Sequence, residues 1–237
     1  MTTCDFDVIA IGGAAFDIPV RPVPGDIMQI GSISADIRMA TGGDALNGSI
    51  SMASLGLRTA LIAYLGTDIF GDAVVARLKQ AGVDTSLILR DENHMTPLAY
   101  LLIEESGERH ILGHGHAAAR AGLCSAHVPD ATLRRARHLH YASVNANKFL
   151  DGDGIADVFA RAQALGLTTS MDAAFDRDGV WLDKSRAALQ HCDIFFPSYS
   201  EAVPIAQGRT DVSDMTEFFR PFGLKYFGCK LGAQGVY

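Results

Sequence analysis

Short apolar runs alternate with helical patterns along most of the chain. The first run, Phe6–Ile11, ends at two glycines, as is typical of a buried parallel strand. Helix signals run from Asp44 to about Leu55, before Gly56, and from about Gly71 to Ala81, before Gly82. Further strands are predicted over 59–65, 138–142, 168–171, 193–196 and 226–229, and further helices over 154–165, 184–190, 201–206 and 214–219. This alternation predicts an α/β fold with a doubly wound, mostly parallel sheet.

Two stretches, Ile27–Met39 and Pro97–Leu112, lack helical periodicity and interrupt this alternation. The second contains a turn at Glu105–Glu108 that resembles a β-hairpin. We expect the two stretches to form a small β-sheet lid over a ligand site. Repeats and Pro/Gly-rich linkers are absent from the sequence, so residues 1–237 are predicted to form a single domain with this lid.

Composition narrows the possible classes of function. Hydrophobic residues make up 48% of the 237 residues, enough for a sizeable core. The net charge of -7 and the absence of a basic stripe exclude nucleic acid as the expected partner. The four cysteines are scattered without metal-binding spacing, which favours reduced thiols. No apolar run is long enough to span a bilayer and the N-terminus lacks a basic leader, so we expect a cytoplasmic protein without membrane contact.

The most informative motif is Gly42-Gly43-Asp44-Ala45-Leu46-Asn47, at the start of a predicted helix. Glycine backbone permits close approach of a ligand, and Asp44 and Asn47 lie one turn apart on the same helix face. A carboxylate and an amide so placed suit sugar hydroxyls. The alternative is an ordinary helix N-terminus, where an acidic residue is favoured by the macrodipole. A second glycine motif, Gly66 to Gly71, follows one predicted strand later.

Two further carboxylates follow predicted strands. Asp17 lies just beyond the first strand, and Asp172 ends the strand near Thr168. The carboxyl ends of parallel strands form the edge at which α/β proteins bind ligands. A loop-capping role is the alternative for both residues.

The stretch from Gly42 through Ser86 resembles the first signature of the ribokinase-like (PfkB) family of carbohydrate and nucleoside kinases. The resemblance implies ATP- and Mg²⁺-dependent phosphorylation of a sugar or nucleoside hydroxyl, and a homodimer formed through the lid. It implies substrate contacts for Asp17, Gly42, Gly43, Asp44, Asn47 and Asp172, and a structural role for Gly66 to Gly71. Ala15 stands where the family often has an asparagine.

Two later segments resemble nucleotide elements of the same family. Ser198 and Glu201 match its Asn-x-x-Glu element at the glutamate alone, and Lys230 to Gly235 is similar to its Thr-Leu-Gly-x-x-Gly element. The resemblance implies ATP contacts for Ser198, Lys230, Gly232 and Gly235, and a magnesium-anchoring role for Glu201.

The histidines at 110, 114 and 116 invite comparison with a metal site. They lack a carboxylate or fourth ligand at zinc-like spacing, which favours a structural or substrate-contact role, with His110 as a candidate substrate contact. Gly113 to Ala118 is also a loose G-x-G-x-x-A match, but it lacks a β-α-β context.

The family's second signature, Gly-Ala-Gly-Asp, supplies an anion hole and the catalytic base, and it does not occur in this sequence. The catalytic residue is therefore unknown, and we expect the 237-residue chain to bind sugar or nucleoside but to phosphorylate it negligibly. One alternative is a non-catalytic sugar- or nucleoside-binding protein or fragment. The other is an NAD-dependent oxidoreductase, based on the β-α alternation and on Gly113 to Ala118.

Overall fold

The computed structural model describes residues 4–114 and 122–237. Its central sheet has six parallel strands in the order β13-β12-β11-β10-β1-β5. The strands are β1 (Phe6–Ile11), β5 (Thr59–Ile62), β10 (Ala136–Val144), β11 (Thr168–Ala173), β12 (Ile194–Phe195) and β13 (Tyr226–Phe227). The predicted doubly wound, mostly parallel sheet is thus confirmed.

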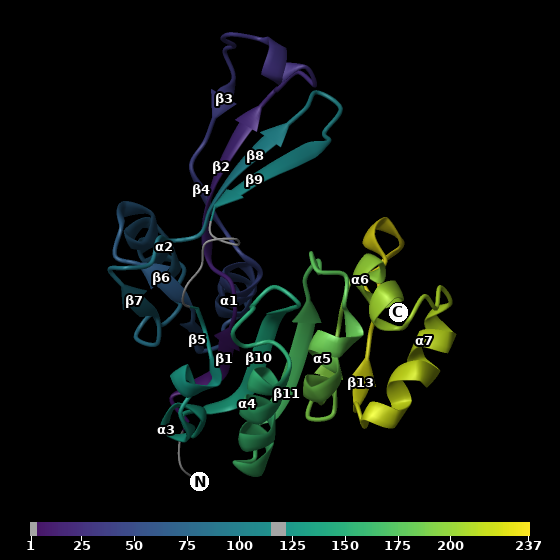
Figure 1. Ribbon diagram of the computed structural model, residues 1–237. Helices are drawn as coiled ribbons and strands as arrows, with labels where there is room; N and C mark the ends of the chain where they lie inside the picture. Colours follow the sequence, from purple (N-terminus) through teal and green to yellow (C-terminus); the bar gives the residue numbers. More distant parts are fainter. Residues whose placement is uncertain (1–3, 115–121) are drawn as a thin grey trace.

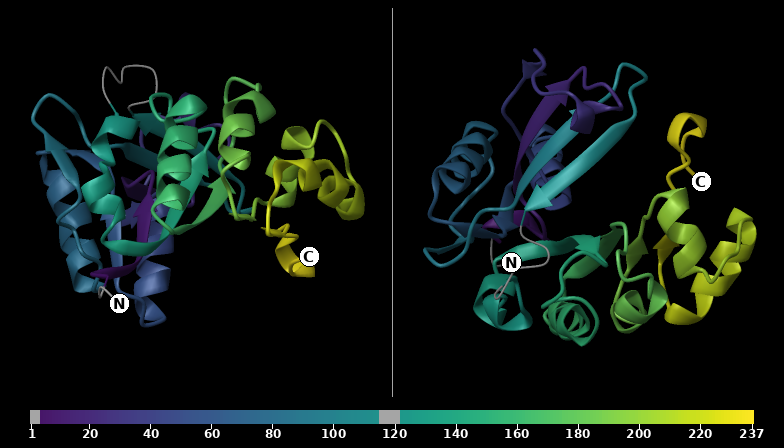
Figure 2. Two further views of the ribbon diagram at one scale, coloured as in Figure 1. Left: turned by 90° about the horizontal axis from the view of Figure 1, so that it is seen from below. Right: turned by 45° about the horizontal axis from the view of Figure 1, so that its top comes forward.

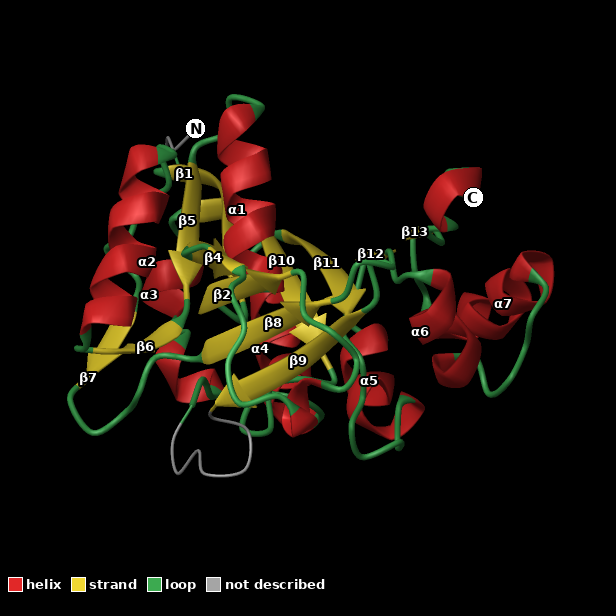
Figure 3. Ribbon diagram, turned by 90° about the horizontal axis from the view of Figure 1, so that it is seen from above, coloured by secondary structure: helices red, strands yellow, loops and turns green. Residues whose placement is uncertain are grey.

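Helices cover the two faces of this sheet (Figure 3). They are α1 (Asp44–Ser54), α2 (Ile69–Gln80), α3 (Asp130–Leu133), α4 (Asp153–Ala164), α5 (Leu182–Leu189), α6 (Tyr199–Ile205) and α7 (Val212–Phe219). On one face, Leu46 of α1 packs with Ala142 of β10 in one buried cluster. On the other face, Leu139 and Tyr141 of β10 pack with Phe159 of α4 in a second cluster. Tyr141 and Ala142 thus face opposite cores, as the period of a strand requires, and a register shift between Tyr141 and Val144 returns Val144 to the core of Tyr141.

The strand order reverses beside β1. The chain passes from β1 to β5 on one side and later returns to place β10 on the other side of β1. The connections leaving the carboxyl ends of β1 and β10 therefore part in opposite directions. This topological switch point opens the crevice in which α/β proteins bind ligands.

A second sheet rises above the α/β body as a lid (Figure 1). Its strands follow the order β3-β2-β8-β9, with β4 also paired to β2. They are β2 (Ala15–Arg21), β3 (Asp36–Ile37), β4 (Ala40–Gly42), β8 (Leu98–Ile103) and β9 (Arg109–His114). The two strands β6 (Tyr64–Gly66) and β7 (Leu89–Asp91) form a separate small sheet beside α2.

The lid differs from its expected composition in one respect. The stretch Ile27–Met39 contributes only β3 and a short 3₁₀ turn over Ile27–Gln29, and it does not pair with β8 directly. Between them lies β2, which pairs with β3 on one side and with β8 on the other. Asp17, expected in a loop, is therefore a strand residue of the lid.

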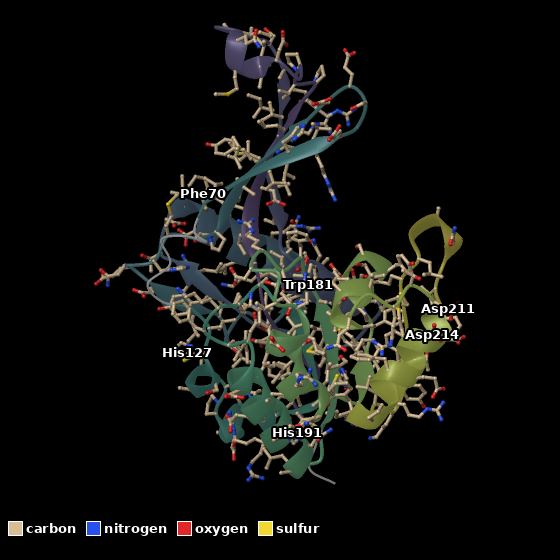
Figure 4. The ribbon with its side chains drawn as sticks, turned by 45° about the vertical axis from the view of Figure 1, so that its right-hand side comes forward. Phe70, His127, Trp181, His191, Asp211 and Asp214 are labelled. Carbon is tan, nitrogen blue, oxygen red and sulfur yellow. The ribbon has the colours of Figure 1, made fainter. Side chains whose placement is uncertain are left out.

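The lid joins the body through closely packed connections. Phe16 of β2 and Phe70 of α2 stack with ring centroids 5.2 Å apart, and Phe70 lies at the base of the lid in Figure 4. In the right-hand view of Figure 2 the lid stands over the edge of the central sheet, with α4 and α5 on the opposite side. A single residue, Gly43, separates the end of β4 from the start of α1.

Among the described residues, no helix combines the length and apolar composition needed to cross a bilayer.

Candidate functional site

A cavity of about 310 Å³ opens at the switch point. The loop after β1, the start of α1 and the loop after β10 form its walls. Its lining includes Gly12, Gly13, Ala14, Ala15, Gly43, Asp44, Tyr64, His94, Ser143, Asn147, Lys148 and Phe149. The size and the mixture of apolar walls with a few polar groups suit a small polar molecule.

Two predicted site glycines lie at points of close packing. A Cβ on Gly43 would lie 2.5 Å from the carbonyl oxygen of Gly13, and Gly43 has φ +98. A Cβ on Gly42 would lie 2.0 Å from Oδ2 of Asp17. The absence of a side chain therefore lets Gly13 approach Gly43 and the Asp17 side chain approach Gly42. Gly43 also lines the cavity.

Asp44 presents its carboxylate at the cavity and accepts a hydrogen bond from the Ser143 hydroxyl at 3.1 Å. Desolvation by burial raises the pKa of Asp44, and the charge of Glu201 raises it further, although the residue keeps part of its surface exposed. The nearby Lys230 lowers the same pKa. The carboxylate thus lacks full compensation of its charge.

Four predicted site residues from distant parts of the chain come together here, and we name them the Lys230 cluster: Asp44, Asp172, Glu201 and Lys230. Lys230 donates a hydrogen bond to Oδ2 of Asp172 at 2.5 Å. Burial raises the pKa of Asp172, the lysine opposes that rise, and Asp44 adds to it. The cluster thus contains three acidic side chains and one basic side chain.

The remaining predicted nucleotide residues lie next to this cluster. Ser198 is the N-cap of α6, and its backbone N–H donates to Oε2 of Glu201 at 2.9 Å. Ser198 also forms a parallel bridge with Lys230. Gly232 and Gly235 have φ +60 and +90, and a Cβ on either would meet no atom within 4 Å. The turn therefore presents open backbone.

The two lid candidates lie on opposite faces of the lid sheet. Asp17 pairs with Ala99, whereas His110 pairs with Leu102, so their side chains point to opposite sides. Ala15 lines the cavity two residues before Asp17, which places Asp17 on the cavity side. His110 lies on the outer face and pairs with Glu104 at 3.0 Å. The structure does not bring His110 to the cavity.

Asn47 is also separated from the cavity. It lines a different surface depression, together with Phe16, Met39 and Arg77. The expected convergence of Asp17, Asp44 and Asn47 on one cavity is therefore absent among the described residues.

Sequence reasoning missed the end of β10 and the loop that follows it. Ser143, Asn147, Lys148 and Phe149 all line the cavity, and none was singled out. The signal was available, because this polar stretch follows a buried strand of the same sheet as Asp172. Asn145 in this loop has φ 83 and is 4% exposed, and neither side-chain amide atom has a hydrogen-bond partner among the described residues.

The metal and dinucleotide alternatives receive no support from the described residues. No group of three or more His, Cys, Asp or Glu side chains within residues 4–114 and 122–237 could hold a metal ion by itself. His116 and most of the candidate dinucleotide loop, residues 115–118, lie outside the described residues.

Fold and cavity together define an α/β protein with a cavity at a switch point, next to a second, smaller β-sheet. The chain belongs to the pfkB family of carbohydrate kinases, whose family model matches residues 8–237. Because this family consists of carbohydrate kinases, the oxidoreductase alternative is set aside.

Curated relatives include sugar kinases. Fructokinase-2 of Zea mays is 33% identical over 106 residues, which are 45% of this chain and 32% of that protein. The 2-dehydro-3-deoxygluconokinase of Bacillus subtilis (strain 168) is 26% identical over 202 residues, which are 81% of this chain and 61% of that protein. The chain thus spans about a third to a half of the length of the fructokinases it matches.

Solved structures share the fold. A PfkB protein from Polaromonas sp. JS666 has a TM-score of 0.79 at 25% identity, covering 98% of this chain and 78% of that one. The fructokinase with bound ATP from Xylella fastidiosa has a TM-score of 0.75 at 23% identity, covering 94% and 71%.

Proposed function

We propose that this protein takes part in the ATP-dependent phosphorylation of a sugar hydroxyl. The observation that carries the proposal is Asp44, a partly desolvated carboxylate that opens a helix at the switch-point cavity of a pfkB family member. Carboxylate oxygens accept hydrogen bonds from sugar hydroxyls, and Asn147 and Ser143 add further polar contacts in the same cavity. Asp17 lies on the cavity side of the lid and is proposed to reach the sugar from above.

The Lys230 cluster fits the nucleotide and magnesium side of this reaction. Burial is the main cause of the raised pKa values of Asp44 and Asp172. Glu201 adds to the rise at Asp44, and Asp44 adds to the rise at Asp172, a repulsion that a divalent cation would relieve. Magnesium uses one or two protein carboxylates together with waters and phosphate oxygens, so Glu201 would anchor it. Lys230 and the open backbone of Gly232 and Gly235 would contact ATP phosphates. ATP would supply the phosphoryl group, and magnesium would neutralise the negative charge on the phosphate oxygens.

Ligand binding tests the proposal first. Isothermal titration with D-fructose and with 2-dehydro-3-deoxy-D-gluconate should give saturable heat for at least one of them. These sugars are chosen because the names of the relatives specify them. If neither sugar binds, and a thermal-shift screen of other sugars and nucleosides gives no stabilisation, the proposal is wrong.

The turnover of the 237-residue polypeptide remains a separate prediction. Because its sequence holds no Gly-Ala-Gly-Asp, we expect it to bind sugar but to release ADP far below the usual kinase range of about 1–100 s⁻¹. An ADP-coupled assay checks this expectation. Turnover within that range would show that a residue of this chain serves as base, and Asp172 is the first to test by D172N.

We also propose a homodimer formed through the lid. Ile37, Tyr100 and Leu112 are 65%, 44% and 60% exposed, and strand register places all three on the outer face of the lid. An apolar face of this kind is typical of a covered interface. Leu112→Glu should convert a dimer into a monomer in light scattering. Ile111→Glu, on the opposite face of the same strand, should leave the dimer intact, and a monomeric parent chain would refute the proposal.

A cytoplasmic location also stays a proposal. The absence of disulfides among Cys4, Cys124, Cys192 and Cys229 supports it, because such thiols persist in reducing compartments.

A further inference from the structure

The loop that forms one wall of the cavity is fastened to the core by a buried carboxylate. Tyr141, which is fully buried in β10, donates its hydroxyl to Oδ1 of Asp151 at 2.6 Å. The other oxygen, Oδ2, accepts the backbone N–H of Asn147 at 2.9 Å. Asp151 thus links the rigid strand to a residue that lines the cavity.

This loop needs such a fastening because its own conformation is unfavourable. Asn145 adopts a left-handed backbone, and its buried side-chain amide has no partner among the described residues. Local compensation comes from the turn bonds that Leu150 and Asp151 donate to the Asn147 carbonyl, both at 2.9 Å. The Ala146 N–H and the side-chain amide of Asn147 also tie the loop to β10, because both donate to the Ser143 carbonyl, at 3.1 and 3.3 Å. Asp151 adds the bond to the buried Tyr141 hydroxyl.

Keeping this carboxylate charged works against the stability of the fold. Burial raises the pKa of Asp151 to about 6, despite opposing hydrogen bonds from Tyr141, Asn147 and Asn145 and the charge of Lys184. Lys184 is itself paired with Asp176 and Asp178, both at 2.6 Å, so it compensates Asp151 only in part. A group with a raised folded pKa stabilises the fold below its unfolded pKa, and that contribution is lost as pH rises through about 6. At neutral pH the folded protein therefore holds a destabilising charge beside its cavity, a pattern typical of functional positions.

We propose that Asp151 is a positioning residue of the sugar site, which holds Asn147 and the adjoining cavity wall in the geometry that binds the ligand. The identity of the ligand rests on the proposed sugar-kinase function. The role of Asp151 in holding the loop does not depend on that function. Asp151 does not line the cavity and acts through Asn147.

The test is Asp151→Asn, measured by hydrogen exchange of the peptide covering residues 145–149 and by titration with the two sugars named above. Whichever way the new amide turns, either the Tyr141 hydroxyl or the Asn147 N–H loses its acceptor. We expect faster exchange in this peptide at pH 7.5 and sugar binding weakened roughly tenfold. The midpoint of thermal unfolding should stay the same or rise, because the buried charge is gone. A purely structural residue would lower stability and affinity together.

Asp193→Asn is the matched control. Asp193 is also a buried carboxylate that accepts a backbone N–H, that of Thr169 at 2.9 Å, but it lies at the opposite, amino end of the strands. Its bonds and Lys225 lower its pKa despite desolvation, so D193N should lower the unfolding midpoint and leave the exchange of 145–149 unchanged. Tyr141→Phe, which keeps the buried ring, serves as a second variant if D151N does not fold.

Unchanged exchange of residues 145–149 in the tested variant would overturn the inference, as would a parallel loss of stability and affinity. If the parent chain binds neither sugar and the thermal-shift screen gives no stabilisation, the proposed function fails, and the exchange measurement alone then decides whether Asp151 fastens the loop.

Discussion

Asp44→Asn is expected to weaken sugar binding by about 1.5–3 kcal/mol, which is the range for a hydrogen bond to a charged group. The carboxylate lines the cavity, and an amide in its place can accept fewer hydroxyl protons. Since burial raises the pKa of Asp44, replacing the charge should not lower the free energy of unfolding. Isothermal titration and urea denaturation of the same samples separate the two effects.

A matched control exists within the chain. Asp153 also opens a helix directly after a glycine with positive φ, Gly152, and so shares the helix-dipole environment of Asp44. Both carboxylates are partly open to solvent, but Asp153 does not line the cavity. Equal weakening by D153N, or unchanged affinity in D44N, would contradict a direct sugar contact by Asp44.

Gly43→Ala should have the largest effect on folding, about 2–5 kcal/mol of lost unfolding free energy. Two causes add: an alanine at φ +98 is strained, and its Cβ would lie 2.5 Å from the Gly13 carbonyl oxygen. The Gly13 carbonyl belongs to backbone, so it cannot swing aside as a flexible side chain would. Urea denaturation measures the loss.

Gly56→Ala separates the two causes. Gly56 follows the other end of α1 with φ +90, and a Cβ there would meet no atom within 4 Å. G56A should therefore show the conformational cost alone, about 1 kcal/mol. If G43A and G56A lose the same free energy, the close approach of Gly43 to Gly13 is not what requires glycine.

Local patterns in the sequence predicted most of the central α/β body, but the strand expected over 59–65 divides into β5 of the central sheet and β6 of the small sheet. The run Phe6–Ile11 matches β1 residue for residue, and the helix expected from Asp44 begins at that residue. A pattern of a few residues, an apolar run or a glycine at a helix end, predicts each of these elements.

The lid and the cavity depend on pairings that local patterns do not encode. The strand β2 contains Asp17 and Pro19, and its place is set by pairing with β8 about eighty residues later. Similarly, the loop after β10 meets Gly13 only because β10 pairs with β1. The face to which His110 points follows from the β8–β9 register, which the sequence alone left open.

The Lys230 cluster depends both on local motifs and on long-range pairing. Each of its four members was identified in the sequence from its own motif, yet nothing in those motifs shows that Lys230 and Asp172 form an ion pair. Their meeting requires β11 and the segment after β13 to lie at the same edge of the sheet.

The single residue between β4 and α1 makes the lid and the helix one mechanical unit. If the lid tilts, Gly43 has only two backbone torsions with which to absorb the rotation, and its contact with Gly13 limits both. The N-terminus of α1, which carries Asp44, must then turn with the lid. If Asp44 contacts the sugar as proposed, tilting of the lid would move this contact, and sugar release would be coupled to lid movement.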